Sequence, residues 1–320
     1  MKNKILEKTC CLFLMIMLFS CAARTQKKLS REARRTNEKD GAEMVLVNEG
    51  KLELGGTREQ IDALKNELVK NLSIKLPDNF GDDFMKQGKI FFVSDFYIYL
   101  YPVTNKQFAK FINETGYKTT AEKNGYAYVY DGKEAKKLDG ANWAHPAGEF
   151  SSIKDILNHP VVHVSFNDAH EYAKWAGCEL PTEAQCEKAA RGAGSFEYPW
   201  GNSYENGKMN TGLGKQPYID NSDGFDFTNP VDAFKNGASS YGVHEMAGNV
   251  WEWTSDWYAA DAYKNMEEKN PTGPSRGEMK VIRGGSWFSH PGMCKSFVRE
   301  KMSPSRYNNE TGFRCVLNIK

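Results

Sequence analysis

The sequence predicts an α+β fold with few helices, short strands and much irregular structure. Of its 320 residues, 28 are Gly and 12% are aromatic, a composition typical of loop-rich domains. Helical periodicity is confined to four segments, and the strand-like runs span only four or five residues each. The formal net charge is only +1, so the composition gives no electrostatic case for binding nucleic acid.

The N-terminus has the pattern of an export segment. Lysines precede an apolar run over residues 12–19, which is too short to span a bilayer as a helix. Residues 18–21 resemble a bacterial lipobox, whose cysteine, here Cys21, becomes the lipidated first residue. We expect a lipoprotein signal peptide over residues 1–20 and a lipid anchor in the cell envelope, in the outer membrane on its periplasmic or surface face. The alternative is a cleaved signal followed by an incidental cysteine.

Residues 21–41 contain the lipidated cysteine and then many basic residues with almost no apolar ones. This composition predicts a solvated tether. A basic arm that recruits a partner is the alternative. The remaining residues, 42–320, form one predicted globular domain.

Four segments have the apolar spacing of amphipathic helices. They are 58–72, the stretch after Thr104 that ends at Gly116, the stretch from Asn167 to Gly177, and a helix opened by the capping box at Thr182 and ended near Gly192. Strands are predicted at 43–47, 90–93, 96–100 and 280–283. The Gly-, Asn- and Pro-rich region 199–230 has no repeating pattern, and a loop of this length inside a compact domain is usually functional or held by a ligand.

The segment 241–257 is the most distinctive part of the chain. Trp251, Trp253 and Trp257 alternate with Glu252 and Asp256 directly after a Gly-Asn pair. The alternation predicts a strand or turn with one wet or metal-facing side. A core strand entered through a Gly-Asn turn is the simpler interpretation.

This segment resembles the formylglycine-generating enzyme family, also called the sulfatase-modifying-factor family, in which G-N-V-W-E-W is a hallmark. The resemblance runs in order along residues 42–320 through further matching segments. These are residues 44–47, 101–105, 140–146, 159–165, 180–184, 198–202, 283–287 and 312–315. It implies a C-type-lectin-like superfold with small twisted antiparallel sheets.

The resemblance also implies bound calcium. One set of matching positions comprises Asn210, Thr211, Asp223 and Phe225. A second set comprises Glu245, Gly248, Val250 and Glu252, with Glu245 where the family often has Asn or Asp. Calcium prefers such mixtures of carboxylate and backbone carbonyl oxygens. Without the resemblance, the same acidic loops would be interpreted as solvated turns.

The catalytic site of the family is incomplete in this chain. Family enzymes bind copper(I) between two cysteines five residues apart and oxidise a cysteine in a Cys-x-Pro-x-Arg segment of a sulfatase to formylglycine. Here Ser289 occupies the first position and Cys294 the second. Copper(I) prefers soft thiolates, and a hydroxyl is a hard ligand, so we expect copper binding to be impaired. His290 or Met293 could substitute as a ligand, or Cys294 could simply pack beneath the loop.

Other family positions of the cleft are retained. Ser286, His290 and Arg314 match residues that line it, and Trp287 is expected to form an aromatic wall. The family's disulfide to the cysteine of G-F-R-C is expected to be absent, because Ala173 stands at the partner position. Cys315 should then be a small buried apolar residue, although the pairing of Cys178, Cys186, Cys294 and Cys315 stays open.

Two function classes remain. The first is a lipid-anchored, calcium-stabilised binding or structural module of the gliding- or secretion-machinery type, with lost or altered oxidase activity and a protein or peptide partner in the cleft. The second is an active formylglycine-generating oxidase whose partner is a sulfatase segment. Whether the chain is an enzyme therefore stays open at this stage.

Overall fold

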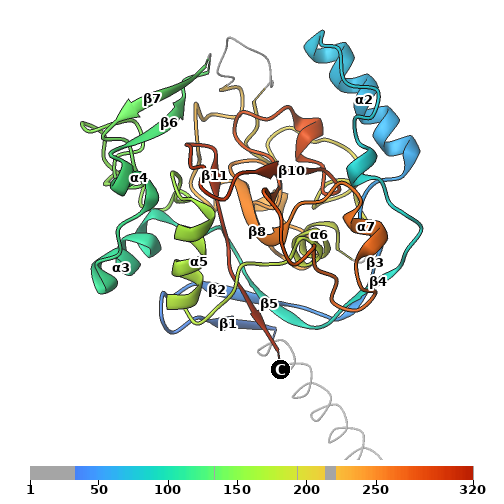
Figure 1. The fold of residues 1–320 in the computed structure, drawn as a ribbon, viewed down its shortest axis with the longest axis horizontal. Coiled ribbons are helices and arrows are strands. Elements are labelled where there is room, and N and C mark those ends of the chain that lie inside the picture. The colour runs from blue at the N-terminus through green and yellow to red at the C-terminus, as the bar shows by residue number, and fades with distance from the viewer. Residues whose placement is uncertain (1–32, 133, 193, 213–220, 320) are drawn as a thin grey trace, which may run out of the picture.

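The computed structural model describes residues 33–132, 134–192, 194–212 and 221–319 (Figure 1). The predicted signal peptide and Cys21 lie outside the described residues. Within the described ranges, no helix combines the length and the apolar character needed to cross a membrane. The predicted α+β architecture is confirmed: small sheets and short helices are joined by long irregular segments.

Two four-stranded sheets organise the molecule. The first is wholly antiparallel, in the order β1 (Arg34–Thr36), β2 (Glu43–Val47), β5 (Phe96–Tyr99) and β12 (Val316–Asn318). It joins the two ends of the domain at the lower edge of Figure 1. The second has the order β10 (Arg299–Met302), β9 (Lys280–Arg283), β8 (Trp251–Trp257) and β11 (Thr311–Gly312). Its β8–β11 pair is parallel, an exception to the antiparallel expectation.

Two ribbons complete the sheets. They are β3 (Gly50–Leu52) with β4 (Phe91–Val93), and β6 (Tyr126–Tyr130) with β7 (Ala135–Asp139). In Figure 1 the β6–β7 ribbon and α2 (Arg58–Leu72), the longest helix of the described residues, lie on opposite sides of the central strand β8.

The helices begin where the sequence places a capping residue. A capping box opens five of them: α2, α3 (Asn105–Thr115), α4 (Thr120–Asn124), α5 (Phe166–Trp175) and α6 (Glu183–Arg191). In each box the side chain of the N-cap Ser or Thr accepts a hydrogen bond from the backbone N–H of the third helical residue. The side chain of that third residue accepts in return from the backbone N–H of the N-cap residue. The other helical segments in the part of the chain that the structure describes are η1 (Asp82–Phe84), η2 (Lys235–Gly237), α7 (Ala262–Asn265) and η3 (Pro291–Cys294).

The folded domain begins earlier than residue 42. Strand β1 pairs with β2, and the turn after it inserts side chains into the core. The Asp40 carboxylate accepts hydrogen bonds from Tyr99 at 2.7 Å and Tyr172 at 2.5 Å, and Asn37 donates to the carbonyl of Ala176 at 3.0 Å. The expected tether is therefore wrong for residues 34–41, because buried hydrogen bonds hold this polar stretch in place.

Strand β8 passes through the core, and its acidic face is buried; only Ser255 and Trp257 on the other face are partly exposed. Trp253 is fully buried, and its indole N–H donates to the carbonyl of Val164 at 3.1 Å. Glu252 and Asp256, on the alternate positions, are each only 4% exposed. The simpler interpretation, a core strand after a Gly-Asn turn, is thus correct, and the acidic side chains must find buried partners.

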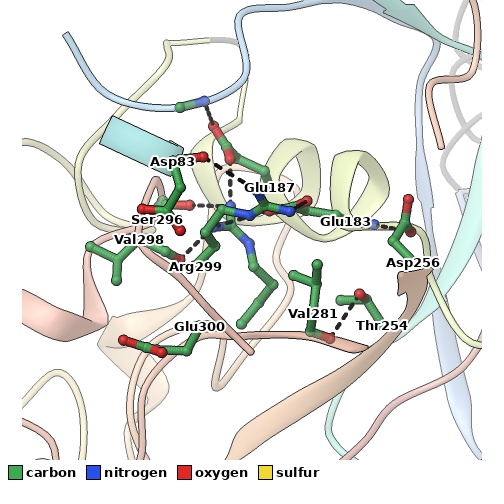
Figure 2. A network of polar contacts seen from close by, with 12 residues as sticks. Asp83, Glu183, Glu187, Thr254, Asp256, Val281, Ser296, Val298, Arg299 and Glu300 are labelled. Atoms are coloured by element: carbon green, nitrogen blue, oxygen red, sulfur yellow. Dashed lines mark hydrogen bonds and ion pairs between the residues drawn. The ribbon is translucent and has the colours of Figure 1, made fainter. Parts of the chain in front are cut away.

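Helix α6 carries buried charges that pair with arginines of the second sheet; Figure 2 shows Glu183, Glu187 and Arg299. Glu187 pairs with Arg191 at 2.8 Å and with Arg283, while Glu183 pairs with Arg299 at 2.8 Å. These five residues form what we call the arginine network, and all are at most 4% exposed. Further donors satisfy the carboxylates: the Gly55 amide donates to Glu187 and the Tyr263 hydroxyl to Glu183, both at 2.8 Å. The network thereby ties α6 to strands β9 and β10 of the second sheet.

Candidate functional site

The loop that follows β9 carries the positions that match the family's catalytic residues. It turns sharply at Gly284 and Gly285, with φ of +98° and +81°. A Cβ at Gly285 would lie 2.3 Å from the Sγ atom of Cys294, so only glycine permits this close approach. Cys294 therefore lies directly beneath the turn. Packing beneath the loop was the alternative to copper binding that the sequence left open for this residue.

The Cys294 thiol is buried and poorly disposed to ionise. Its side chain has no exposed surface and packs with Tyr198, Met209 and Ala247. Burial raises the pKa of Cys294 to about 12. A thiol is the neutral form of the ligand that copper needs, so this environment disfavours metal binding at neutral pH.

Ser289 belongs to a short chain of hydrogen bonds. Its hydroxyl oxygen accepts from the Ser286 amide at 3.0 Å and lies 3.2 Å from the Ser286 hydroxyl. Ser286 in turn donates to a carboxylate oxygen of Glu310 at 3.1 Å. Burial raises the pKa of Glu310, and the hydrogen bond from Ser286 opposes that shift. Glu310 was not predicted as a site residue, because it lies outside every recognisable local pattern in the sequence.

His290 points towards helix α2. Its Nδ1 accepts from the Gly292 amide at 3.1 Å, its Nε2 lies 3.2 Å from the Asn71 amide nitrogen, and Glu67 is 3.8 Å away. Burial lowers the pKa of His290. Both imidazole nitrogens of His290 therefore contact groups other than Ser289, namely the Gly292 amide and the Asn71 side chain on α2.

These residues do not fit copper(I). The site combines a hydroxyl, a buried neutral thiol and an imidazole engaged with another helix. Across the described ranges, His, Cys, Asp and Glu side chains form no group of three or more with a metal-binding arrangement. The fallback ligand Met293 packs at the edge of the main hydrophobic core. No replacement for the missing thiolate is assembled here.

Arg314 and Trp287 are structural residues instead of parts of the cleft wall. Both nitrogens of the Arg314 fork bind Glu252, at 2.6 and 2.7 Å, and Arg314 has no exposed surface. Trp287 is 2% exposed and donates to the carbonyl of Asn309 at 2.9 Å. The expectation that they line a cleft is wrong, because the polar groups of each side chain satisfy buried partners.

The described cysteines are all unbonded. Cys178, Cys186, Cys294 and Cys315 are free and buried. Cys315 has no exposed surface, which confirms the expectation of a small buried residue. The structure contains no disulfide among these four residues.

At the first predicted calcium position, the Asp223 carboxylate holds two loop segments together by hydrogen bonds. The two carboxylate oxygens of Asp223 accept from the backbone amides of Thr211 and Phe225, each at 3.0 Å. Asn210 donates to the carbonyl of Phe227 at 2.7 Å and to the side chain of Asn229 at 2.8 Å. Hydrogen bonds thus join three of the four residues predicted for this position, Thr211, Asp223 and Phe225, whereas the Asn210 side chain bonds Phe227 and Asn229.

The second predicted position contains an unsatisfied carboxylate. Glu245 has a φ of +54°, a conformation uncommon for a residue with a side chain, and is 7% exposed. One of its oxygens accepts from Asn229 at 3.1 Å, whereas its Oε2 is buried with no hydrogen-bond partner in the described part of the chain. Burial raises the pKa of Glu245 to about 8, against hydrogen bonds from Asn229 and Asn249.

The two predicted positions adjoin one another. The Asn249 amide donates to the carbonyl of Asn210 at 2.9 Å, and a Cβ at Gly248 would lie 2.2 Å from that oxygen. Asn229 bridges to Asn210 and Glu245, so we call Asn210, Asn229, Asn249 and Glu245 the asparagine cluster. A buried carboxylate oxygen without a donor fits a hard cation. Sequence reasoning did not identify Asn229 or Asn249, which act only through these long-range contacts.

Comparison with known proteins gives a consistent result. The model of the sulfatase-modifying factor enzyme 1-like domain matches residues 29–319. The chain is 41% identical over 250 residues to the formylglycine-generating enzyme of Mus musculus, a match that covers 70% of this chain and 66% of that protein. It is 39% identical over 267 residues to the enzyme of the same name from Thermomonospora curvata, with 75% and 88% covered.

A relative with a different name is nearly as similar. The inactive C-alpha-formylglycine-generating enzyme 2 of Bos taurus is 36% identical over 249 residues, covering 70% of this chain and 77% of that protein. Among solved structures, PvdO from Pseudomonas aeruginosa has a TM-score of 0.65 at 24% identity, covering 89% of this chain and 98% of that one. Treponema denticola variable protein 1 has a TM-score of 0.59 at 18% identity with the same coverage. These two likenesses show the fold alone.

Proposed function

The chain belongs to the sulfatase-modifying factor enzyme 1-like family, and from this premise we propose that it is a member without the copper-dependent oxidase reaction, which acts as a calcium-stabilised protein-binding module. The observation that carries the proposal is the loop 284–294. A serine hydroxyl stands where the first thiolate would be, and it is hydrogen-bonded to Ser286. One buried, neutral thiol cannot by itself supply a soft two-sulfur site.

Calcium is the cation that we propose for the asparagine cluster. Glu245 supplies an oxygen that has no donor in the described structure, and the surrounding groups are oxygen-rich amides. A calcium ion held by Glu245 and neighbouring carbonyl oxygens would compensate the buried charge and brace the loop before β8. The ion would serve the fold and would also brace the loop that carries Ser289, because the Asn249 carbonyl accepts from the Trp287 amide at 2.9 Å and the Gly212 amide donates to the Ser289 carbonyl at 3.1 Å.

The cell envelope is the proposed location, with Cys21 as the lipid-bearing residue. The support is the order of basic region, apolar run and Ser-Cys junction in the sequence. Mass spectrometry of the membrane fraction should detect a diacyl- or triacyl-modified Cys21. Detection of a soluble exported form that begins at Ala22 or Ala23 would show that the protein is not anchored through Cys21.

A peptide assay tests the loss of the reaction. The purified domain, loaded with copper(I) under air, is incubated with a Cys-x-Pro-x-Arg peptide, and the mass loss that marks formylglycine is followed over time. We expect no conversion above the copper-only control. The bacterial relative from Thermomonospora curvata is the matched positive control, since it is similar over 75% of this chain.

An active oxidase is the second candidate function. The observation that favours it is the 41% identity to a protein named formylglycine-generating enzyme, which exceeds the 36% identity to the inactive paralogue. Robust copper-dependent conversion by the wild-type protein would establish this candidate. His290→Ala and Met293→Leu would then show which side chain replaces the missing thiolate.

A further inference from the structure

The face where the tether reaches the folded domain lies at the lower edge of Figure 1. It is formed by strands β1, β5 and β12 of the first sheet and by the C-terminal end of α5. Arg34, the first residue of β1, is thirteen residues after Cys21, and thirteen residues span at most about 45 Å. A lipid on Cys21 would therefore hold this face close to the bilayer. We call it the anchor face and define it by Arg34, Arg35, Lys39, Tyr97, Trp175 and Ile319.

Buried hydrogen bonds fix the anchor face to the core. Strand β1 pairs with β2 over three residues, and the Asn37 side chain donates to the carbonyl of Ala176, at the end of α5, at 3.0 Å. Tyr97 and Trp175 both pack at the rim of the main core cluster, whereas Ile98, the next residue along β5, belongs to the second cluster. The two aromatic rings thus lie on one side of the first sheet, in a fixed arrangement.

Cationic groups lie over both of these rings. The Arg35 guanidinium carbon is 5.3 Å from the centroid of the Tyr97 ring, and Lys39 Nζ is 5.1 Å from that of Trp175. Both aromatic residues are partly buried, and Ile319, beyond the end of β12, is 48% exposed. Tyr and Trp rings are enriched at the headgroup level of membranes, where long basic side chains extend their charges to the phosphates. The anchor face combines these features.

Positive charge is concentrated where the chain enters this face. Residues 22–39 contain seven Lys or Arg and two Glu, a net charge of +5, whereas the whole chain carries +1. Arg34 has Glu43 at 3.7 Å and Lys39 has Glu114 at 2.8 Å, but all four side chains are exposed to solvent. Exposed ion pairs contribute little to stability, so both cations are free to bind a phosphate group instead. The charge is thus complementary to anionic phospholipid headgroups.

We propose that the anchor face lies against anionic phospholipid headgroups, with Arg34, Arg35 and Lys39 at phosphate groups and Ile319 at the boundary with the acyl chains. This inference rests on the proposed envelope location and names the surface that meets the membrane. A protein with an acidic surface is the other class of partner that this charge admits. The membrane is favoured because the chain itself brings the anchor face to the bilayer.

The proposal places the loop with Ser289 away from the bilayer. Helix α2 lies at the upper right of Figure 1, remote from the first sheet at the lower edge. The loop contacts this helix, because His290 Nε2 is 3.2 Å from the Asn71 amide nitrogen and η3 packs against α2. With the anchor face on the membrane, the loop therefore faces the aqueous phase, where a soluble partner can reach it.

Flotation with lipid vesicles tests the proposal. The mature chain, residues 21–320, carries Cys21→Ser, which removes the acyl acceptor, and is mixed with vesicles of phosphatidylglycerol and phosphatidylcholine or of phosphatidylcholine alone. We expect a partition coefficient at least about tenfold higher on the anionic vesicles. Arg34→Gln/Arg35→Gln should lower it by at least about tenfold, since each basic residue near an anionic surface strengthens binding about fivefold. Both arginines are exposed, so the double variant should fold normally, which its melting temperature checks.

A double variant on the opposite edge is the matched control. Lys70→Gln/Lys75→Gln removes the same charge at the end of α2 and just beyond it, where both lysines are exposed. We expect it to change the partition coefficient by less than about twofold, because screening weakens charges that are far from the membrane. Hydrogen exchange of the vesicle-bound protein locates the contact independently. Amides of residues 34–40 and 316–319 should exchange at least about threefold more slowly than in solution, and those of α2 at an unchanged rate.

Three results would overturn the proposal: equal partition onto the two kinds of vesicle, equal losses in the two double variants, or protection from exchange that is confined to α2. The first would assign the positive charge to an acidic partner protein. Because the Cys21→Ser chain carries no acyl group, failure here leaves lipidation of Cys21 standing. Absence of the acyl group from the wild-type protein would instead disprove the anchor and leave the vesicle measurements unchanged.

Discussion

The arginine network on α6 and the asparagine cluster before β8 both bury carboxylates, but they differ in how the charge is balanced. In the arginine network, Glu183 and Glu187 meet the guanidinium groups of Arg191, Arg283 and Arg299 at hydrogen-bonding distance. Figure 2 shows Arg299 beside the two glutamates. In the asparagine cluster, the nearest guanidinium, that of Arg314, is engaged by both oxygens of Glu252. Glu245 accepts one hydrogen bond, from the Asn229 side chain at 3.1 Å, and its other carboxylate oxygen has no hydrogen-bond partner in the described part of the chain.

The comparison shows what each region needs in order to be stable. Opposite charges within the chain compensate the carboxylates of the arginine network, so that region is complete by itself. Glu245 can be buried at neutral pH only with a proton or with a cation from solution, since a bare buried carboxylate is costly. The arginine network should therefore be stable without a bound ion, whereas the stability of the asparagine cluster should depend on calcium and on pH.

The largest expected effect comes from breaking the arginine network. Glu187→Gln keeps the size of the side chain but leaves Arg191 and Arg283 without their shared carboxylate. We expect the free energy of unfolding to fall by about 3–5 kcal/mol, because buried charges are left uncompensated. Urea denaturation followed by tryptophan fluorescence measures this change.

An exposed ion pair provides the control for that experiment. Lys86 and Glu53 are 2.7 Å apart but 36% and 48% exposed. Solvent screening should limit the effect of Lys86→Gln to less than about 1 kcal/mol. If both substitutions cost the same, burial does not distinguish the two pairs and the account of the network fails.

Calcium should have the next largest effect. At a calcium concentration 100 times the Kd, binding to the native state alone adds about 2.7 kcal/mol, which is roughly 4–5 °C in melting temperature for a domain of this length. Chelation should remove this gain, and Glu245→Gln should abolish most of it. Asp223→Asn isolates the contribution of the first predicted position. A melting temperature that is indifferent to the chelator would show that neither position binds calcium.

The pH response of the calcium-free protein should have a definite sign. The pKa of Glu245 is raised from 4.5 to about 8, so the folded state keeps a proton that the unfolded state releases. The free energy of unfolding should therefore fall as pH rises from about 5 to 8, with a slope of at most about 1.4 kcal/mol per pH unit from this group. The difference between wild type and Glu245→Gln isolates this contribution. A rising or flat difference would mean that Glu245 is ionised throughout.

Local sequence signals predicted much of the fold. The periodic segment 58–72 coincides with α2, and the capping box at Thr182 opens α6, because these patterns depend on neighbours three or four residues away. Strands 43–47 and 280–283 were also predicted within their observed bounds. Strand β1 was missed because three polar residues carry no strand pattern, and pairing with β2 alone makes them a strand.

The candidate site was less accessible to sequence reasoning. The serine at the first catalytic cysteine position, Ser289, is evident from the sequence alone. Of the residues predicted for the first calcium position, Asp223 does contact Thr211 and Phe225. The roles of Asn229, Asn249 and Glu310 could not be read, because each depends on contacts with residues far along the chain. Arg314 was assigned to the cleft, whereas Glu252 across the core determines where it points.

A copper(I) titration of the wild type and of Ser289→Cys tests whether the serine at position 289 deprives this chain of copper. We expect the wild-type domain to lose copper(I) to a competing chelator that Ser289→Cys resists, with an affinity gain of at least about a hundredfold. Restoring the second thiol supplies the soft ligand pair that the chain lacks. Equally tight binding of copper(I) by the wild-type protein would contradict the account, because a side chain other than that of residue 289 would then complete the site.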